Sequence, residues 1–256
     1  MINIQTQEGE QLDDKTGLLA FLFPEFSVMT VLYEDNHIII VNKAAGEIVQ
    51  GDKTGDIPLP EIIKAYLKEK YAKPGNVFLG VAHRLDRPVS GIVVFAKTSK
   101  ALSRLCEMFK KGTVHKTYHA LLPTAALRRP VPVEGTALEH WIWRNEKQNK
   151  SYVRSAGTQG AKQALLDCRH IASSERYTLV EVNLHTGRHH QIRCQLSHTF
   201  APIHGDLKYG APRSNPDGSI CLHARHISFE HPVSHQLICV TAPYPALGIW
   251  RFFESE

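Results

Sequence analysis

Residues 77–96 read Val-Phe-Leu-Gly-Val-Ala-His-Arg-Leu-Asp-Arg-Pro-Val-Ser-Gly-Ile-Val-Val-Phe-Ala. The apolar runs 77–81 and 92–96 are typical of β-strands. The segment between them, 83–91, is dense in ionisable and hydroxyl side chains: His83, Arg84, Asp86, Arg87 and Ser90. Loops carried by rigid strands are where catalytic side chains usually lie. Residues 83–91 are therefore a candidate site, and the alternative is a purely structural salt-bridged turn around Asp86.

The pattern outside this loop predicts the rest of the fold. Strands are expected at 28–32, 37–42, 117–122, 163–171, 177–184, 222–229 and 236–241, and helices at 61–72, 99–111 and 188–200. Residues 124–160 are expected to be irregular, with short strands on long loops. Because the strands outnumber the helices and do not alternate regularly with them, the sequence predicts an α+β fold with a mixed, mainly antiparallel central sheet.

Length and composition are those of an ordinary soluble globule. The chain has 256 residues, of which 43% are hydrophobic and 21% charged. No apolar run approaches the roughly 20 residues of a membrane span, and the N-terminus lacks the pattern of a signal peptide. A cytoplasmic protein is therefore expected. We expect one domain, 29–256, preceded by an N-terminal extension, 1–28, which is polar and acidic first and then a short apolar helix or tether.

Cysteine and histidine spacing does not favour a metal site. The five cysteines are Cys106, Cys168, Cys194, Cys221 and Cys239. Their odd number and wide spacing fit neither a disulfide framework nor a zinc ribbon. The chain has 15 histidines, but their clusters lack paired metal-ligand spacing. No metal is expected.

Charge is divided unevenly along the chain. Residues 1–60 hold 10 acids and 3 bases, whereas residues 61–256 hold 15 acids and 27 bases. The stretch 97–129 alone has 8 bases and 1 acid. A basic main body indicates a polyanionic partner. The alternative is that lysines simply coat a soluble surface.

A second chemistry-bearing stretch is Thr-Gly-Arg-His-His-Gln-Ile-Arg at 186–193. If a helix opens here, its first turns carry cations, which the helix dipole disfavours. An anionic partner would explain them, and an ordinary surface helix is the alternative. Three other stretches are weak when taken singly: Lys-Thr-Tyr-His-Ala at 116–120, Gly-Asp-Leu-Lys-Tyr-Gly at 205–210 and Leu-His-Ala at 222–224.

Taken together and in this order, these motifs resemble the RluA-type pseudouridine synthases. Residues 31–43 are similar to that family's first strands, 83–91 to its catalytic loop, 116–120 to its Lys-x-Tyr strand and 186–193 to its Thr-Gly-Arg-x-His-Gln-Ile-Arg helix. The segments 205–210 and 222–224 also match. The resemblance runs from about residue 29 to about residue 241.

The resemblance implies an RNA-modifying isomerase that needs no cofactor and no metal. The C1′–N1 bond of a uridine breaks, the uracil turns, and C5 joins C1′. Asp86 matches the required carboxylate, Arg193 the cation that pairs with it, and Tyr118 the residue that stacks on the base and helps to move the C5 proton. A buried carboxylate stays ionised only if a cation compensates its desolvation, which suits this pairing.

The resemblance also implies RNA contacts, because a stacked uridine must be flipped out of the RNA to react. Arg84 matches a residue that can enter the RNA stack, and guanidinium planes stack well on bases. The basic stretch 97–129 and Arg188 would hold phosphates. The remaining substrate-binding candidates are His83, Arg87, Lys116, His190 and Gln191. The expected partner is tRNA or rRNA, bound by a monomer without an obligate protein partner.

The sequence departs from the family pattern in three places. Ala44 stands where many members have proline, and Val89 where threonine is common. Many relatives carry an S4 RNA-binding domain of about sixty residues, and we expect it to be absent here, because only a short acidic segment precedes residue 29. The catalytic domain is therefore expected to recognise RNA by itself.

Two rival functions remain to be weighed. His-Gly-Asp-Leu at 204–207 looks like the catalytic loop of antibiotic-type phosphotransferases. That loop needs a magnesium-holding Asn about five residues after the Asp, but position 211 is Ala and no phosphate-cradling glycine loop precedes it. The other rival is an RNA-binding module that has lost activity. The presence of Asp86, Tyr118 and Arg193 speaks for catalysis.

Overall fold

The computed structural model describes residues 2–4, 29–51, 54–246 and 248–253. Its strands join one 12-stranded sheet in this part of the chain. They are β1 (Ile2–Ile4), β2 (Thr30–Glu34), β3 (Ile38–Lys43), β4 (Gly80–Val81), β5 (Ser90–Ala96), β6 (His115–Pro123), β7 (Thr136–Asn145), β8 (Lys150–Arg154), β9 (Lys162–Ser173), β10 (Tyr177–Leu184), β11 (Leu222–Glu230) and β12 (Leu237–Thr241). The α-helices are α2 (Leu59–Lys70), α3 (Ser99–Lys111) and α4 (Gln191–Thr199).

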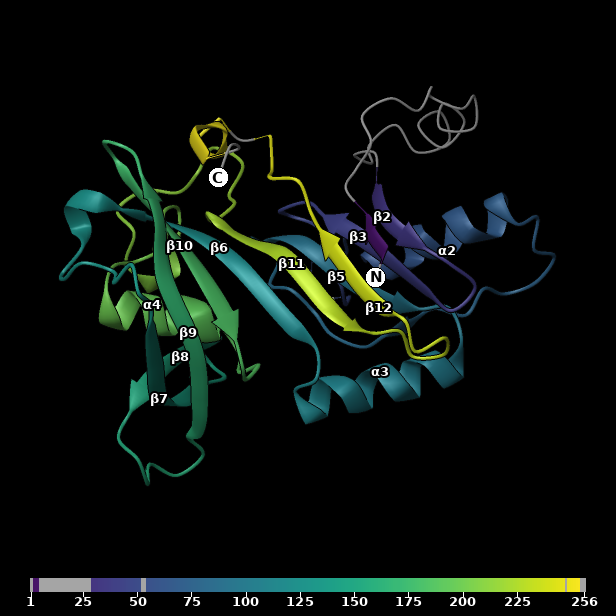
Figure 1. The fold of residues 1–256 in the computed structure, drawn as a ribbon, viewed down its shortest axis with the longest axis horizontal. Coiled ribbons are helices and arrows are strands. Elements are labelled where there is room, and N and C mark those ends of the chain that lie inside the picture. Colours follow the sequence, from purple (N-terminus) through teal and green to yellow (C-terminus); the bar gives the residue numbers. More distant parts are fainter. Residues whose placement is uncertain (1, 5–28, 52–53, 247, 254–256) are drawn as a thin grey trace.

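The sheet confirms the predicted α+β class. Its order is β2-β3-β5-β11-β6-β10-β9-β7-β8, and β1, β4 and β12 lie off this path. Pairing is antiparallel except between β5 and β11 and between β1 and β12. Figure 1 shows β2, β3, α2 and α3 in one half of the molecule and β7–β10 with α4 in the other. The late strand β11 lies between β5 and β6 and joins the two halves.

The core follows from the apolar runs of the sequence. Every residue of β5 is buried, as is typical of a central strand covered on both faces. Helix α3 begins after Thr98, whose hydroxyl accepts a hydrogen bond from the Ala101 N–H, and ends at Gly112 in the left-handed conformation. Gly91 has φ +112°, and a Cβ there would collide with the backbone of Ala224 on β11. Glycine is therefore required where the candidate loop enters the sheet.

Residues 124–160 are more regular than expected. They contain the long antiparallel hairpin of β7 and β8, closed by a turn in which Asn149 adopts φ 45°. Leu138 and Ile142 point inward on one face of β7. Trp141 and Trp143 occupy the other face, which hides the apolar-polar alternation that would have indicated a strand.

Two boundaries also differ from expectation. β4 keeps only Gly80 and Val81 of the expected strand 77–81. Helix α4 begins at Gln191 instead of residue 188, because His190 adopts φ 52° and breaks the helical geometry before it. Arg188 therefore lies in the loop, and the only Lys or Arg in the first turn of α4 is Arg193.

Of the expected N-terminal extension, 1–28, the structure describes only β1. This strand pairs in parallel with β12. The short apolar helix or tether expected before residue 29 lies outside the described residues. No helix in the described part of the chain combines the length and the apolar character needed to cross a membrane.

Candidate active site

A cleft of about 1080 Å³ is lined by residues from both halves of the molecule. Every candidate site residue from the sequence lines it: His83, Arg84, Asp86, Arg87, Lys116, Tyr118, Arg188, His190, Gln191 and Arg193. These residues come from the β4–β5 loop, from β6, and from the loop and first turns at α4. The structure therefore brings three separate sequence motifs to one place.

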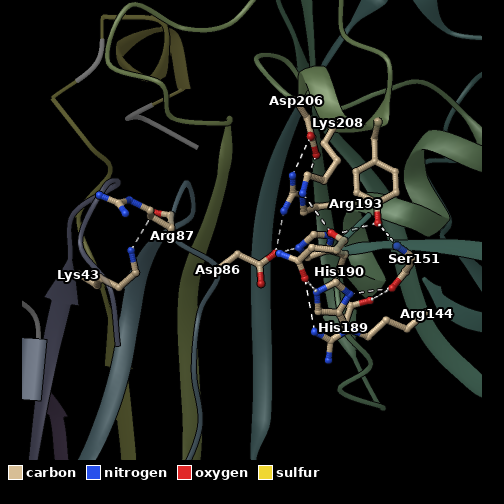
Figure 2. Close-up of polar contacts among 12 residues, drawn as sticks. Lys43, Asp86, Arg87, Arg144, Ser151, His189, His190, Arg193, Asp206 and Lys208 are labelled. Atoms are coloured by element: carbon tan, nitrogen blue, oxygen red, sulfur yellow. Dashed lines mark hydrogen bonds and ion pairs between the residues drawn. The ribbon is translucent and has the colours of Figure 1, made fainter. Parts of the chain in front are cut away.

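The loop that carries Asp86 is held mainly through its backbone. The Val89 N–H donates to the Asp86 carbonyl at 3.0 Å, and the Gly46 N–H donates to the Arg87 carbonyl at 2.8 Å. Lys43, which is 1% exposed, donates from Nζ to the Arg87 carbonyl at 3.2 Å and to the Ala44 carbonyl at 2.8 Å (Figure 2). Burial lowers the pKa of Lys43 to about 8, and Arg87 adds to the effect. A buried amine thus links the middle of the candidate loop to the backbone that follows β3.

Arg193 joins Asp86 to a second carboxylate. Its Nη1 donates to Oδ2 of Asp86 at 3.0 Å, while Nε and Nη2 donate to the two oxygens of Asp206 at 2.7 and 2.8 Å. Asp206 is fully buried, whereas the Asp86 side chain is 32% exposed. Burial alone would lower the pKa of Arg193, but the hydrogen bonds and charges of Asp206 and Asp86 outweigh burial and raise it. Arg193 is therefore a fixed cation beside a carboxylate that still faces the cleft.

His190 lies next to the same carboxylate. Its Nε2 is 3.4 Å from Oδ2 of Asp86, and its Nδ1 is 3.1 Å from the hydroxyl of Tyr209, in the short helical turn Leu207–Tyr209. The His190 ring stacks on that of His189 with 3.8 Å between centroids. Burial and, to a smaller extent, the charge of Arg193 lower the pKa of His190 to about 2, so the ring is neutral.

Tyr118 is buried on β6 and contributes to the cleft wall. Burial raises the pKa of its phenol, and the negative charge of Asp86 raises it further. The phenol therefore stays protonated at neutral pH. In this state it offers a ring face and a hydrogen-bond donor, but it is not a ready base.

Two candidates on the cleft wall are engaged mainly with the protein. His83 accepts a hydrogen bond at Nε2 from the Val94 N–H at 2.9 Å, and its ring lies 4.5 Å from that of Phe109. Burial lowers the pKa of His83 to about 3, and the neighbouring Lys116 contributes. Burial also lowers the pKa of Lys116. His83 is therefore neutral and serves to join the loop to β5.

The other three arginine candidates, Arg84, Arg87 and Arg188, are exposed, and each has at least one protein partner. Arg84 donates to the side chain of Gln50, and Arg87 forms an ion pair with Asp56. Arg188 donates from Nε to the Gln163 carbonyl at 2.8 Å. These contacts hold the three side chains without burying them.

Gln191 organises the loop before α4. Its Oε1 accepts from the Arg188 N–H at 2.9 Å and from the Thr186 hydroxyl at 2.8 Å, and its Nε2 donates to the Leu165 carbonyl at 3.1 Å. The Gln191 amide is thus committed to local structure. Its substrate-binding role stays a prediction, as do the roles of the other candidates.

Sequence reasoning assigned no role to Asp206, Tyr209, His189, Ser151 and Arg144. Asp206 and Tyr209 fall in the motif 205–210, which matched the resemblance but gave no partner for either residue. A signal that could have found Asp206 is that it is the one acid in residues 201–211. Ser151 and Arg144 belong to the hairpin that was expected to be irregular.

The cleft is strongly cationic. Among the described residues that line it, Asp86 is the one acidic side chain, and eight are lysines and arginines: Arg84, Arg87, Lys110, Lys111, Lys116, Arg144, Arg188 and Arg193. Such a lining attracts a polyanion. No group of three or more His, Cys, Asp or Glu in the described ranges is placed to hold a metal ion.

The sequence profile of the RNA pseudouridylate synthase family matches residues 37–198, a span that includes the candidate loop and most of α4. The chain belongs to this family. Among curated relatives of this pseudouridine synthase are the RNA pseudouridine synthase YhcT of Bacillus subtilis and the ribosomal large subunit pseudouridine synthase D of Xanthomonas campestris. The first is 30% identical over 95% of this chain and 78% of the relative, and the second 32% over 87% and 68%.

A relative named tRNA pseudouridine synthase C, from Haemophilus influenzae, is 28% identical over 84% of this chain and 92% of its own. These relatives and the family profile confirm the RluA-type resemblance. The solved structure of human RNA pseudouridylate synthase domain containing 4 has a TM-score of 0.70 at 21% identity, covering 92% of this chain and 94% of that one. This likeness confirms the fold.

The phosphotransferase alternative is wrong. In this pseudouridine synthase, the aspartate of His-Gly-Asp-Leu is Asp206, whose two oxygens accept hydrogen bonds from Arg193. A carboxylate with 1% exposure in that position is a structural partner of Arg193 and cannot receive a substrate.

Proposed function

We propose that this chain is an RNA pseudouridine synthase that isomerises specific uridines in structured RNA, tRNA or rRNA, with Asp86 as the reacting carboxylate. One observation carries the proposal. Asp86 is the single acid among the described residues of the cationic cleft, it is hydrogen-bonded to Arg193, and about a third of its side chain is accessible. A uridine of a polyanion can therefore be brought to a carboxylate whose negative charge is already compensated.

The wall beside Asp86 suits a flipped base. Leu85, Val89 and Ile192 line the cleft with apolar surface, and Tyr118 adds an aromatic ring. Because burial keeps the phenol protonated, stacking on the base and donating a hydrogen bond are its favoured roles. Moving the C5 proton would require Tyr118 to lose its own proton first.

Flipping a uridine costs a few kcal/mol, and RNA contacts must supply it. Arg84 is exposed and lies two residues before Asp86, so its guanidinium is placed to enter the gap that the base leaves. The remaining cleft cations are placed to contact phosphates. We propose that residues 29–256 form one domain that supplies these RNA contacts.

Relatives named for tRNA and for the large ribosomal subunit support both RNA classes as candidate substrates. We further propose a cytoplasmic monomer without an obligate protein partner, because docking on an asymmetric RNA requires no two-fold symmetry.

Release of tritium from 5-tritiated uridine tests the proposal. The wild-type protein is incubated with bulk tRNA and, separately, with unmodified rRNA. Release from one pool that is abolished in Asp86→Ala supports the reaction and selects the RNA class. Asp217→Ala, at an exposed aspartate outside the cleft lining, is the matched control and should keep wild-type release. Full activity of Asp86→Ala contradicts the proposed role of the carboxylate.

A further inference from the structure

The two oxygens of Asp86 are not equivalent. Arg193 Nη1 lies 3.0 Å and His190 Nε2 lies 3.4 Å from the same atom, Oδ2 (Figure 2). In the described part of the chain, no side chain or backbone donor is hydrogen-bonded to Oδ1. Since the Asp86 side chain is 32% exposed on the cleft wall, Oδ1 is the oxygen that a substrate can reach.

The position of the proton on His190 follows from a chain of hydrogen bonds. The Ser151 backbone N–H, which can only donate, donates a hydrogen bond to the hydroxyl oxygen of Tyr209 at 2.9 Å. The Tyr209 proton is then available to Nδ1 of His190 at 3.1 Å. If Nδ1 accepts, the single proton of the neutral ring is on Nε2, the nitrogen that lies 3.4 Å from Oδ2 of Asp86.

The opposite tautomer of His190 is disfavoured at both ring nitrogens. With the proton on Nδ1, the lone pair of Nε2 would face the Asp86 carboxylate at 3.4 Å, and the Tyr209 proton would lose its acceptor. A doubly protonated ring would add a cation to a site where Arg193, Lys208 and Arg144 already act on His190, besides the neighbouring ring of His189. The geometry therefore selects one protonation state.

We propose that His190 is a positioning residue for Asp86: Tyr209 sets its tautomer, and its neutral Nε2–H together with Arg193 anchors Oδ2 and leaves Oδ1 directed at the uridine. This inference rests on the proposed function. It gives His190 a role other than contacting RNA. A neutral second donor orients the carboxylate without cancelling more of its charge, which a reacting carboxylate must keep whether it adds to the ribose or removes a proton.

A double-mutant cycle tests the relay. Tyr209→Phe keeps the ring but removes the proton that Nδ1 accepts, and Tyr209 has no hydrogen bond or ion pair with Asp86 among the described residues. We expect a single-turnover rate constant about tenfold lower, the size of one lost hydrogen bond, with RNA affinity within about twofold of wild type. His190→Gln keeps a donor but has no tautomers. Tyr209→Phe should therefore cause little further loss in that background.

Controls and a second readout keep the test sharp. Tyr33→Phe, on the distant strand β2, removes a phenol hydrogen bond to Asp35 and should leave the rate unchanged. Nitrogen NMR of histidine-labelled protein, without RNA, should show His190 protonated at Nε2 in the wild type and shifted toward Nδ1–H in Tyr209→Phe. This spectrum depends on the hydrogen-bond chain and not on turnover.

The outcomes separate the two proposals. Additive losses in the cycle, or a wild-type His190 that carries its proton on Nδ1, overturn the positioning role even if the enzyme turns over. Absence of turnover by the wild type on every RNA tested overturns the proposed function, whatever the NMR result.

Discussion

Arg193 holds Asp206 with two hydrogen bonds, at 2.7 and 2.8 Å, and this ion pair is sealed from solvent. The third nitrogen of Arg193, Nη1, donates to Oδ2 of Asp86 at 3.0 Å. One cation thus serves a buried carboxylate that fixes it and an accessible one that faces the cleft. Substitution of Asp206 should therefore mainly lower stability, whereas substitution of Asp86 should mainly lower activity.

Asp206→Asn should destabilise the protein by about 3 kcal/mol, because it removes one partner of a buried ion pair. Asp86→Asn should cost only about 1 kcal/mol, since its contact with Arg193 is partly solvated, yet it should abolish turnover. Urea unfolding and tritium release on both variants check this. A larger loss of stability in Asp86→Asn than in Asp206→Asn would contradict the assignment.

Gly91→Ala should destabilise the fold by about 3 kcal/mol. The left-handed backbone costs about 1–2 kcal/mol for a residue with a Cβ, and the collision with Ala224 adds an overpacking cost of similar size. Gly112→Ala is the matched control, because Gly112 has φ +73° but open space around it. It should lose only about 1 kcal/mol. Equal losses in the two variants would show that the β5–β11 contact adds no constraint.

Buried neutral histidines should make the protein less stable in acid. Burial lowers the pKa of His223 to about 3, with Arg225 and His119 adding to the effect. Between pH 6.5 and pH 3, His223 is therefore protonated in the unfolded chain but stays neutral in the folded protein. As the pH decreases through this window, the free energy of unfolding decreases by up to about 1.4 kcal/mol per pH unit for such a histidine.

His223→Gln removes that titration. The unfolding free energy is measured in urea at pH 7.5 and at pH 5.0. Between these two values, His223→Gln should lose less unfolding free energy than the wild type, whatever its stability at pH 7.5. His115→Gln, at an exposed position, should keep the wild-type slope. An unchanged slope in His223→Gln would show that His223 takes up its proton in the folded state.

Lys110→Ala should weaken RNA binding without changing single-turnover chemistry. Lys110 is exposed on the cleft rim and placed to contact a phosphate. Removing one phosphate contact should reduce the slope of log affinity against log salt by about 1. Binding is measured by fluorescence anisotropy at several salt concentrations, with Lys68→Ala on α2, outside the cleft lining, as the control. A salt slope equal to that of the wild type would place the RNA elsewhere.

The sequence predicted best those elements whose signals are local. Helix α3 has the predicted bounds, because an amphipathic pattern lies between a Thr98 cap and Gly112. The hairpin of β7 and β8 was missed, because aromatic side chains on the outer face of β7 disguise the alternation. The buried role of Asp206 was missed for a different reason. Only the tertiary fold brings it to Arg193, and no local pattern reports such a partner.

The same distinction applies to the site. The motifs named Asp86, Tyr118 and Arg193, and the fold places all three on one cleft. The motifs could not reveal that Oδ2 of Asp86 is the anchored oxygen, because this depends on which ring nitrogen of His190 faces Tyr209. Such information lies in angles and distances rather than in residue identity.

The place of β11 between β5 and β6 has a consequence for the order in which the molecule matures. Asp86 precedes β5, Arg193 follows β10, and the strand that joins their two halves comes later in the chain than either. During synthesis, Asp86 and Arg193 leave the ribosome before β11, the strand that joins the two halves carrying them. The nascent chain should therefore remain catalytically silent beside abundant RNA until its last strands are made, so that activity itself reports completion of the sheet.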